Sequence, residues 1–210
     1  MKKSNKTGAV MLPALLAMAA MMLPSGAQAQ FSDSYNFLKA VRERDGTKAT
    51  DLLNEPGSTI VNTRELSTGS TALHIVVERR DTTWIAFLLQ KGADPNIADK
   101  QGTTPLMLAT MLRYPDGAEA LLKKKARVDE ANNSGETPLI RAVQLRDIAM
   151  VRLLLENGAD PDHVDSIAGQ SARDYASGDA RAASILAEIE KNDEKRAGTA
   201  RPEKVFGPSL

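Results

Sequence analysis

Apolar residues recur at helical spacing in pairs of short segments along the middle of the chain. In the clearest copy, Leu139 and Val143 lie one helical turn apart, and a second apolar run over residues 148–156 has the same spacing. Thr137 is typical of a helix start, because its hydroxyl can accept a hydrogen bond from a free backbone N–H. Gly158 is typical of a helix end, because it adopts left-handed backbone without a Cβ clash. The pattern predicts a helix–turn–helix unit closed by a loop.

The same unit recurs every 33 residues. Three sets of corresponding positions carry identical residues: Thr71, Thr104 and Thr137; Leu73, Leu106 and Leu139; Ala93, Ala126 and Ala159. A fixed period of this size indicates a repeat architecture, in which one helix pair cannot bury its apolar face alone. We therefore expect neighbouring pairs to stack on each other.

The repeated residues resemble the ankyrin repeat, whose signature runs G-x-T-P-L-H-x-A, then V-x-L-L-L, then G-A-D-x-N. The matching segments are Gly69–His74, Gly102–Met107 and Gly135–Ile140 for the opening box, and Gly92–Asn96 and Gly158–Asp162 for the closing box. The resemblance implies an all-α ankyrin-repeat solenoid of stacked helix–turn–helix units with short hairpin loops. We expect this domain over residues 30–190, as about four repeats plus a C-terminal cap, and a disordered tail over residues 191–210.

Residues 1–29 have the order of a secretory signal peptide. A basic start, MKKSNK, precedes the apolar run AVMLPALLAMAAMML, and Ala27-Gln28-Ala29 has the small-x-small pattern of a cleavage site. We expect cleavage after Ala29 and a periplasmic or secreted protein. The alternative is an uncleaved anchor, but Pro13 breaks the run, which is shorter than the ~20 residues of a membrane span. No stable membrane insertion is expected after cleavage.

Charge and composition exclude several classes of protein. The chain has 27 basic and 27 acidic residues, and residues 1–29 hold three of the basic ones and no acidic one. The remaining 24 basic and 27 acidic residues give a net charge of −3, which does not favour nucleic acid as a partner. The absence of cysteine rules out disulfides and thiolate metal sites.

Catalytic chemistry has few candidate residues. The cluster DPDHVD, residues 160–165, does not have the ligand spacing of a calcium loop, and we interpret it as a polar turn. His74 lacks a nucleophile or paired carboxylate at catalytic spacing, and the resemblance implies that it bonds backbone between adjacent units. We predict no enzymatic activity and no cofactor. A cryptic metal-dependent hydrolase is the remote alternative.

Four arginines occupy the same place at the end of the first helix of each unit: Arg44, Arg80, Arg113 and Arg146. Stacking would align them in a column. One interpretation is a cation at each helix C-terminus, neutralised by an adjacent aspartate. The other is a ladder that accepts acidic side chains of a partner protein.

The resemblance also implies that partners dock on the concave face, which is formed by the hairpins and the exposed side of each first helix. The predicted partner-binding residues are Glu78, Arg79, Arg80, Lys100, Gln101, Met111, Leu112, Arg113, Asn133, Gln144, Leu145 and Arg146. We interpret the chain as a non-enzymatic module that binds another protein. The alternative function is a chaperone-like or regulatory accessory to one periplasmic enzyme. Trp84 and Phe87 are expected in the core.

The third unit departs from the pattern in ways that should weaken it. Lys125 stands where a helix-ending glycine is expected, and Gly117 lies inside the second helix. A left-handed residue other than glycine costs roughly 1–2 kcal/mol, and a glycine within a helix about 1 kcal/mol. We predict that this unit is the softest part of the stack.

Overall fold

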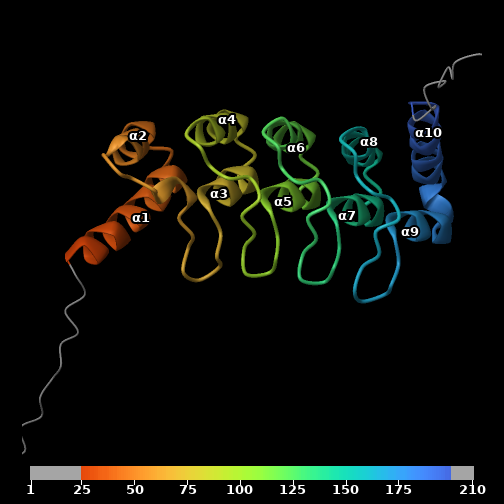
Figure 1. Cartoon of the computed structure of the whole chain (residues 1–210), viewed down its shortest axis with the longest axis horizontal. Coiled ribbons are helices and arrows are strands. Elements are labelled where there is room, and N and C mark those ends of the chain that lie inside the picture. The colour runs from red at the N-terminus through yellow and green to blue at the C-terminus, as the bar shows by residue number, and fades with distance from the viewer. Residues whose placement is uncertain (1–24, 200–210) are drawn as a thin grey trace, which may run out of the picture.

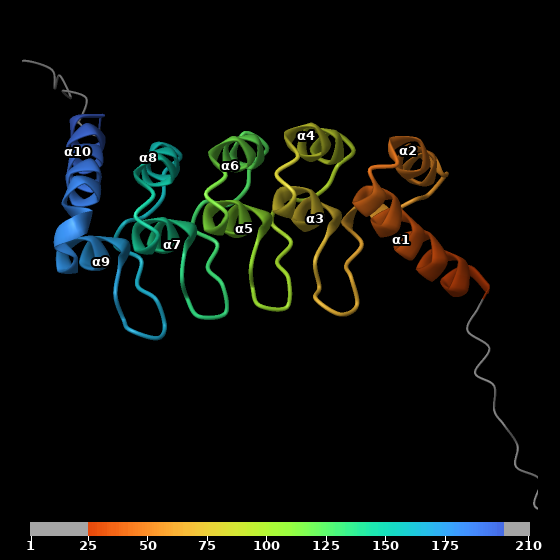
Figure 2. The same cartoon turned by 180° about the vertical axis from the view of Figure 1, so that it is seen from behind.

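A computed structural model describes residues 25–199, with side chains from Asp33 to Gly198. Two rows of helices run along the stack, and hairpin loops project from the first row (Figures 1 and 2). The first row contains α1 (Ser25–Glu43), α3 (Ala72–Glu78), α5 (Pro105–Met111), α7 (Pro138–Gln144) and α9 (Ala172–Gly178). The second row contains α2 (Gly46–Asn54), α4 (Thr82–Gln90), α6 (Pro115–Leu122), α8 (Ile148–Glu156) and α10 (Ala183–Thr199). Short 3₁₀ turns, η1 (Ile60–Asn62) and η2 (Ala180–Ala182), complete the described elements. The predicted all-α repeat fold is confirmed.

The unit that was clearest in the sequence forms as predicted. Thr137 caps α7, its hydroxyl accepting a hydrogen bond from the Ile140 backbone N–H. α8 covers the predicted residues 148–156. Gly158 follows with a φ of +92°, the left-handed conformation expected after the helix. Local capping and turn chemistry therefore set these boundaries.

The core lies between the two rows and continues through the stack. Each first helix packs against its own second helix and against the first helix of the next unit. Leu73, Leu106 and Leu139 occupy the same position in successive units and are buried. Ala109 and Ala142, which follow Leu106 and Leu139 by about one helical turn, are small and fully buried. These small side chains let the helices approach closely, which explains a core with few aromatic residues.

Backbone hydrogen bonds join each hairpin to the next. The Lys100 N–H donates to the Thr68 carbonyl at 2.9 Å, and the Ser166 N–H donates to the Ser134 carbonyl at 2.9 Å. Gly102 lies at such a junction with a φ of +77°, where an added Cβ would stand 2.6 Å from the Asn133 backbone nitrogen. The hairpins thus form a connected row rather than independent loops.

The C-terminal end differs from the sequence prediction. α10 continues through Lys191 to Thr199, where we expected the start of a disordered tail. Arg152 makes two hydrogen bonds to Glu188, at 2.7 and 3.2 Å, and Arg173 forms a 2.9 Å ion pair with Asp193. The boundary at residue 190 therefore falls inside a helix that is attached to the stack. Residues 200–210 lie outside the described part.

The N-terminal end overlaps the predicted leader. α1 begins at Ser25, so the expected cleavage after Ala29 would remove its first five residues. Residues 1–24, which hold the rest of the predicted signal peptide, lie outside the described residues. Within the described chain, no helix combines the length and the apolar character needed to cross a membrane.

Candidate functional site

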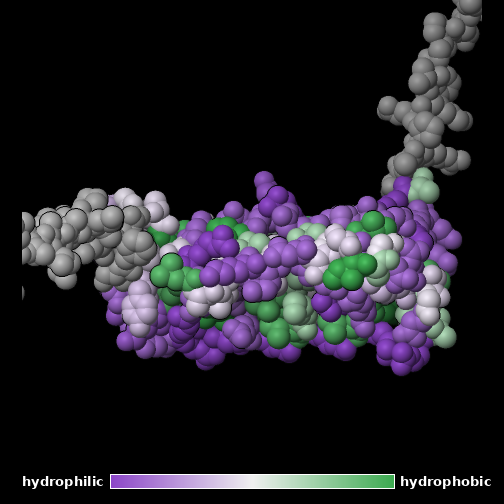
Figure 3. All heavy atoms as spheres, turned by 90° about the horizontal axis from the view of Figure 1, so that it is seen from below, coloured by the Kyte–Doolittle hydropathy of each residue, from purple (hydrophilic) through white to green (hydrophobic). Residues whose placement is uncertain are grey.

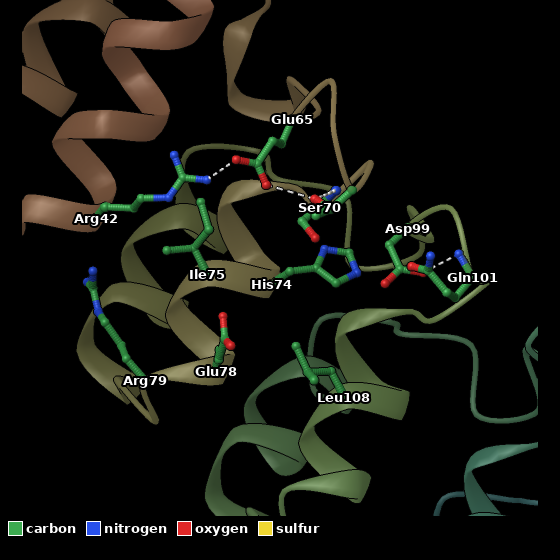
Figure 4. Close-up of a pocket in the computed structure, with 11 residues that line it drawn as sticks. Arg42, Glu65, Ser70, His74, Ile75, Glu78, Arg79, Asp99, Gln101 and Leu108 are labelled. Atoms are coloured by element: carbon green, nitrogen blue, oxygen red, sulfur yellow. Dashed lines mark hydrogen bonds and ion pairs between the residues drawn. The ribbon is translucent and has the colours of Figure 1, made fainter.

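The concave face carries a cavity of ≈ 540 Å³ between α1, α3, α5 and the first two hairpins. Its lining comprises Arg42, Glu65, Thr68, Ser70, His74, Ile75, Glu78, Arg79, Asp99, Gln101 and Leu108 (Figure 4). Seen from below, the molecule is mainly hydrophilic, with hydrophobic residues in separate patches (Figure 3). The lining of the cavity combines the apolar side chains of Ile75 and Leu108 with polar and charged ones.

Helical spacing places the apolar wall of this cavity. Ile75 lies in α3 one turn before Glu78, which is the last residue of that helix. Leu108 holds the same position in α5, 33 residues later. Both side chains are half-buried and pack against the core. The side chain of Glu78 points into the space beside them (Figure 4).

An ion pair closes the N-terminal end of the cavity. Arg42 of α1 reaches Glu65 of the first hairpin at 2.6 Å. The Thr68 hydroxyl donates a 2.8 Å hydrogen bond to the other carboxylate oxygen of Glu65. The Thr68 hydrogen bond, followed by the charge of Arg42, lowers the pKa of Glu65 below its ordinary value. Glu65 thus stays ionised at neutral pH and holds Arg42 in place.

His74 has the structural role predicted for it. Its Nδ1 accepts a 3.1 Å hydrogen bond from the Thr71 backbone N–H, and its Nε2 lies 2.9 Å from the Thr103 carbonyl of the next unit. Because a carbonyl only accepts, the proton belongs on Nε2 and the ring is neutral. Burial lowers the pKa of His74, in agreement with that form. The side chain links two repeats and is 3% exposed, so it is not available as a general base.

Arg79 lines the cavity, but its guanidinium group makes its contacts with other residues of this chain. Its guanidinium donates to the Val41 carbonyl and to Asp81, the latter at 3.2 Å. It also lies over the Trp84 ring, 5.1 Å from the ring centroid, which is a cation–π distance. One guanidinium nitrogen, Nη2, is buried with no hydrogen-bond partner among the described atoms. The charge of Arg79 is therefore directed mainly toward α1 and α4.

The expected core position of Trp84 and Phe87 needs correction. Ile85, Leu88 and Leu89 form the buried side of α4, which leaves the two rings half-buried at its edge. Their centroids are 5.4 Å apart in an edge-to-face arrangement. They line a ≈ 250 Å³ surface cavity together with Arg44 and Thr50. The helical period turned them partly outward.

The four column arginines share a left-handed backbone, with φ between 51° and 60°. Each reaches into the following unit. Arg80 donates to the Leu112 carbonyl, and Arg113 donates to the Leu145 carbonyl at 2.6 Å. The contacts at the two ends are ion pairs, Arg44 with Asp81 at 3.6 Å and Arg146 with Asp179 at 3.0 Å.

These contacts change one interpretation of the column. In one of the two interpretations, the aspartates that follow Arg44, Arg80 and Arg146 neutralise them. Instead Asp45, Asp81 and Asp147 cap the second helices by accepting backbone N–H bonds. The guanidinium groups of Arg80 and Arg113 bond the next first helix at its C-terminal end, where free carbonyls favour a cation. The arginines thus join repeats, while their role toward a partner stays a prediction.

The other predicted residues divide between the cavity and contacts within the protein. Glu78, Arg79 and Gln101 line the cavity. Lys100 Nζ donates to the Leu66 carbonyl at 2.7 Å, and the Asn133 amide donates to the Lys100 carbonyl at 3.0 Å.

Beyond the cavity, Met111 is 45% exposed, whereas Leu112 and Leu145 are half-buried. Gln144 donates to Glu136 at 3.2 Å. None of these contacts tests binding by the predicted residues, which remains a prediction.

Several lining residues were absent from the sequence prediction. Ile75 and Leu108 could have been found, because they lie one turn before Glu78 and Met111 on the same helices. Glu65 and Asp99 come from hairpins, and no helical period places them. Among the described residues, no three His, Asp or Glu side chains group to hold a metal ion.

Comparisons with known proteins agree with this geometry. A family model described as ankyrin repeats (3 copies) matches residues 37–132, and an ankyrin repeat model matches residues 134–166. The human 2-5A-dependent ribonuclease is 36% identical over 87 residues, which are 41% of this chain and 12% of that protein. The human oxysterol-binding protein-related protein 1 is 40% identical over 72 residues, which are 34% of this chain and 8% of that protein. The chain thus spans only a small part of either relative.

Proposed function

Because the chain belongs to the ankyrin-repeat family, whose members are generally non-catalytic protein-interaction modules, we propose that it binds a protein segment on its concave face. The ≈ 540 Å³ cavity carries this proposal, since the first helices of three units and two hairpins combine there to form one surface. Apolar walls at Ile75 and Leu108 supply buried area, and polar groups at its rim supply orientation.

Site-directed photo-crosslinking in cells tests the surface. A photoreactive residue at Gln101, in the cavity, should capture a protein partner. The same residue at Thr83, on the second-helix row, is the control and should not. Leu108→Arg fills the cavity with charge and should abolish the crosslink at Gln101, whereas Ile148→Arg, also on the second row, should leave it intact.

Several outcomes separate the possible roles. Equal capture at Gln101 and Thr83 would contradict docking on the concave face. Recovery of one and the same enzyme under all conditions would favour the accessory function. Circular dichroism of both arginine variants shows whether a lost crosslink reflects lost folding.

We also propose that the protein is exported. The basic start, the apolar run and the Ala27-Gln28-Ala29 pattern support cleavage after Ala29. Mass spectrometry of the fractionated protein should show an N-terminus at Gln30, and Ala29→Glu should block processing. A purified protein that retains Met1 would contradict cleavage.

A further inference from the structure

On the basis of the proposed docking face, we propose that the cavity between α3 and α5 receives a basic side chain of the partner segment, held by Glu78. We further propose that an apolar side chain of the same segment fills the adjacent cavity between α1 and the first hairpin. The partner class is therefore a basic, partly apolar polypeptide segment.

The charges that line the cavity support a cationic ligand. Arg42 is paired with Glu65 at 2.6 Å, and Arg79 is paired with Asp81 at 3.2 Å. The Asp99 carboxylate accepts backbone N–H bonds from Gln101 and Thr103 through Oδ1.

The Glu78 side chain has neither a hydrogen bond nor an ion pair with the described residues, and its carboxylate faces the cavity (Figure 4). The charge left uncompensated in this cavity is thus negative, and an ammonium or guanidinium group would complement it.

The walls beside Glu78 suit the stem of a long basic side chain. Ile75 and Leu108 present half-buried apolar groups on either side of the space. Lysine and arginine bury their methylene groups along such surfaces while the charged end stays near a polar partner. An acidic residue would instead meet Glu78 as a like charge.

The groove continues beyond the ion pair that closes the cavity. Arg42 and Glu65 line a second cavity of ≈ 320 Å³ as well, so the two cavities adjoin at this pair. Tyr35 and Leu66 in the second cavity are 66% and 82% exposed, and Leu38 forms its buried side. Large apolar groups exposed beside a polar groove mark an interface. One extended segment can therefore contact both cavities.

The test uses synthetic peptides of one neutral scaffold that carry a leucine and one variable residue, with the spacing between them varied. The variable residue is lysine, norleucine or glutamate. The full chain should bind the lysine peptide roughly two- to five-fold tighter than the norleucine peptide, and the glutamate peptide weakest. Added salt should shrink this preference.

Variants assign the preference to particular residues. Glu78→Gln should bind lysine and norleucine peptides equally, with the norleucine affinity unchanged. Glu156→Gln, a matched change on the exposed surface of α8, should leave the preference intact. Leu66→Ser should weaken every leucine peptide but not the discrimination between lysine and norleucine. Amide chemical-shift changes in α3 and α5 report where each peptide binds.

Failure of this inference is distinguishable from failure of the proposed function. Binding in the groove without a lysine preference, or a preference that survives Glu78→Gln, overturns the inference and leaves the docking face standing. Absence of both peptide binding and a crosslink at Gln101 overturns both. A Gln101 crosslink to a second copy, or to residues 200–210 of the same chain, overturns the inference by naming another occupant.

Discussion

Gly102 lies where two hairpins meet, and the close contact there leaves no room for a side chain. Its left-handed φ and the 2.6 Å approach of the Asn133 nitrogen both exclude a side chain. We predict that Gly102→Ala lowers the free energy of unfolding by more than the roughly 1–2 kcal/mol of left-handed strain alone, because hairpin bonds must also shift. Chemical denaturation measures the loss.

Gly57 provides the matched control. Its φ is +81°, but nothing lies within 4 Å of an added Cβ. Gly57→Ala should therefore show the backbone strain without the clash. Equal losses for the two variants would mean that the contact between hairpins contributes nothing.

His74 should make stability depend on pH in the mildly acidic range. Burial lowers its pKa in the folded state, so the unfolded chain takes up a proton first as pH falls. Stability should be full above about pH 6.5, the ordinary histidine value, and should decline as pH falls below it. Denaturation curves at pH 7.5 and 5.5 measure this change.

A methionine replacement isolates the histidine contribution. The next repeat carries Met107 in the same position, where it is fully buried. His74→Met should remove the loss between the two pH values, although it also removes the link to Thr103. A decline that persists in this variant would assign it to other groups.

How far single residues could be predicted depends on where their partners lie. The role of His74 could be predicted because its place in the opening box matches the ankyrin repeat, and the resemblance implied a backbone contact between adjacent units. The bonds of Arg80 and Arg113 did not follow, since their acceptors are carbonyls 32 residues away. Local charge pairing suggested that an adjacent aspartate would be the partner of Arg80. That aspartate instead caps the following helix.

Among the elements, α6 differs from α4 in where its aromatic ring comes from: the ring belongs to the residue before the helix and not to the helix itself. The Tyr114 ring covers Gly117, where an added Cβ would lie 2.3 Å from the ring. Tyr114 is 7% exposed, and its hydroxyl donates to Thr82 at 3.0 Å. In α4 the corresponding residues are Asp81 and Trp84, so there the ring comes from the helix itself. Gly117 thus makes room for a packed side chain.

Gly117→Ala should therefore destabilise the protein, although alanine is the better helix former. We expect a loss of about 1–3 kcal/mol from overpacking, measured by denaturation. Tyr114→Ala combined with Gly117→Ala should lose less than the two single changes together, because the clash is gone. Gly178→Ala, in open space at the end of α9, is the control and should be neutral or stabilising.

Element boundaries were predictable where caps and period agree, as in α7 and α8. α10 was not, because its second half is polar and lacks the repeat pattern. Its order comes from contacts made across the stack, such as Arg173 with Asp193 and Asn192 with the Leu155 carbonyl. The softness of the third unit stays a prediction. Hydrogen exchange should show Leu121 less protected than Leu154.

At the scale of the whole molecule, the arginine column couples one repeat to the next. Arg113 keeps a strained φ of 51° and bonds the Leu145 carbonyl. Arg113→Ala retains the strain and loses the bond, whereas Arg113→Gly relieves the strain. We expect alanine to be less stable than glycine by about 1–2 kcal/mol, measured by equilibrium unfolding. Equal stabilities would contradict a strained junction.

The concave groove belongs to this largest scale, which limited its prediction. The sequence period identified the exposed positions of each first helix, including Glu78. It could not show that Arg42 and Glu65 meet across 23 residues and divide two cavities. A surface assembled from three successive first helices and two hairpins appears only when the units are stacked.

Arg80 and Arg113 each bond a carbonyl 32 positions ahead, and this regularity has a consequence for chain length. The interior junctions use the same hydrogen bond, from an arginine to a carbonyl of the next first helix. A duplicated module inserted after α6 would therefore have hydrogen-bonding partners on both sides. The array can therefore grow or shrink by whole modules while the end contacts, Arg44 with Asp81 and Arg146 with Asp179, stay as they are.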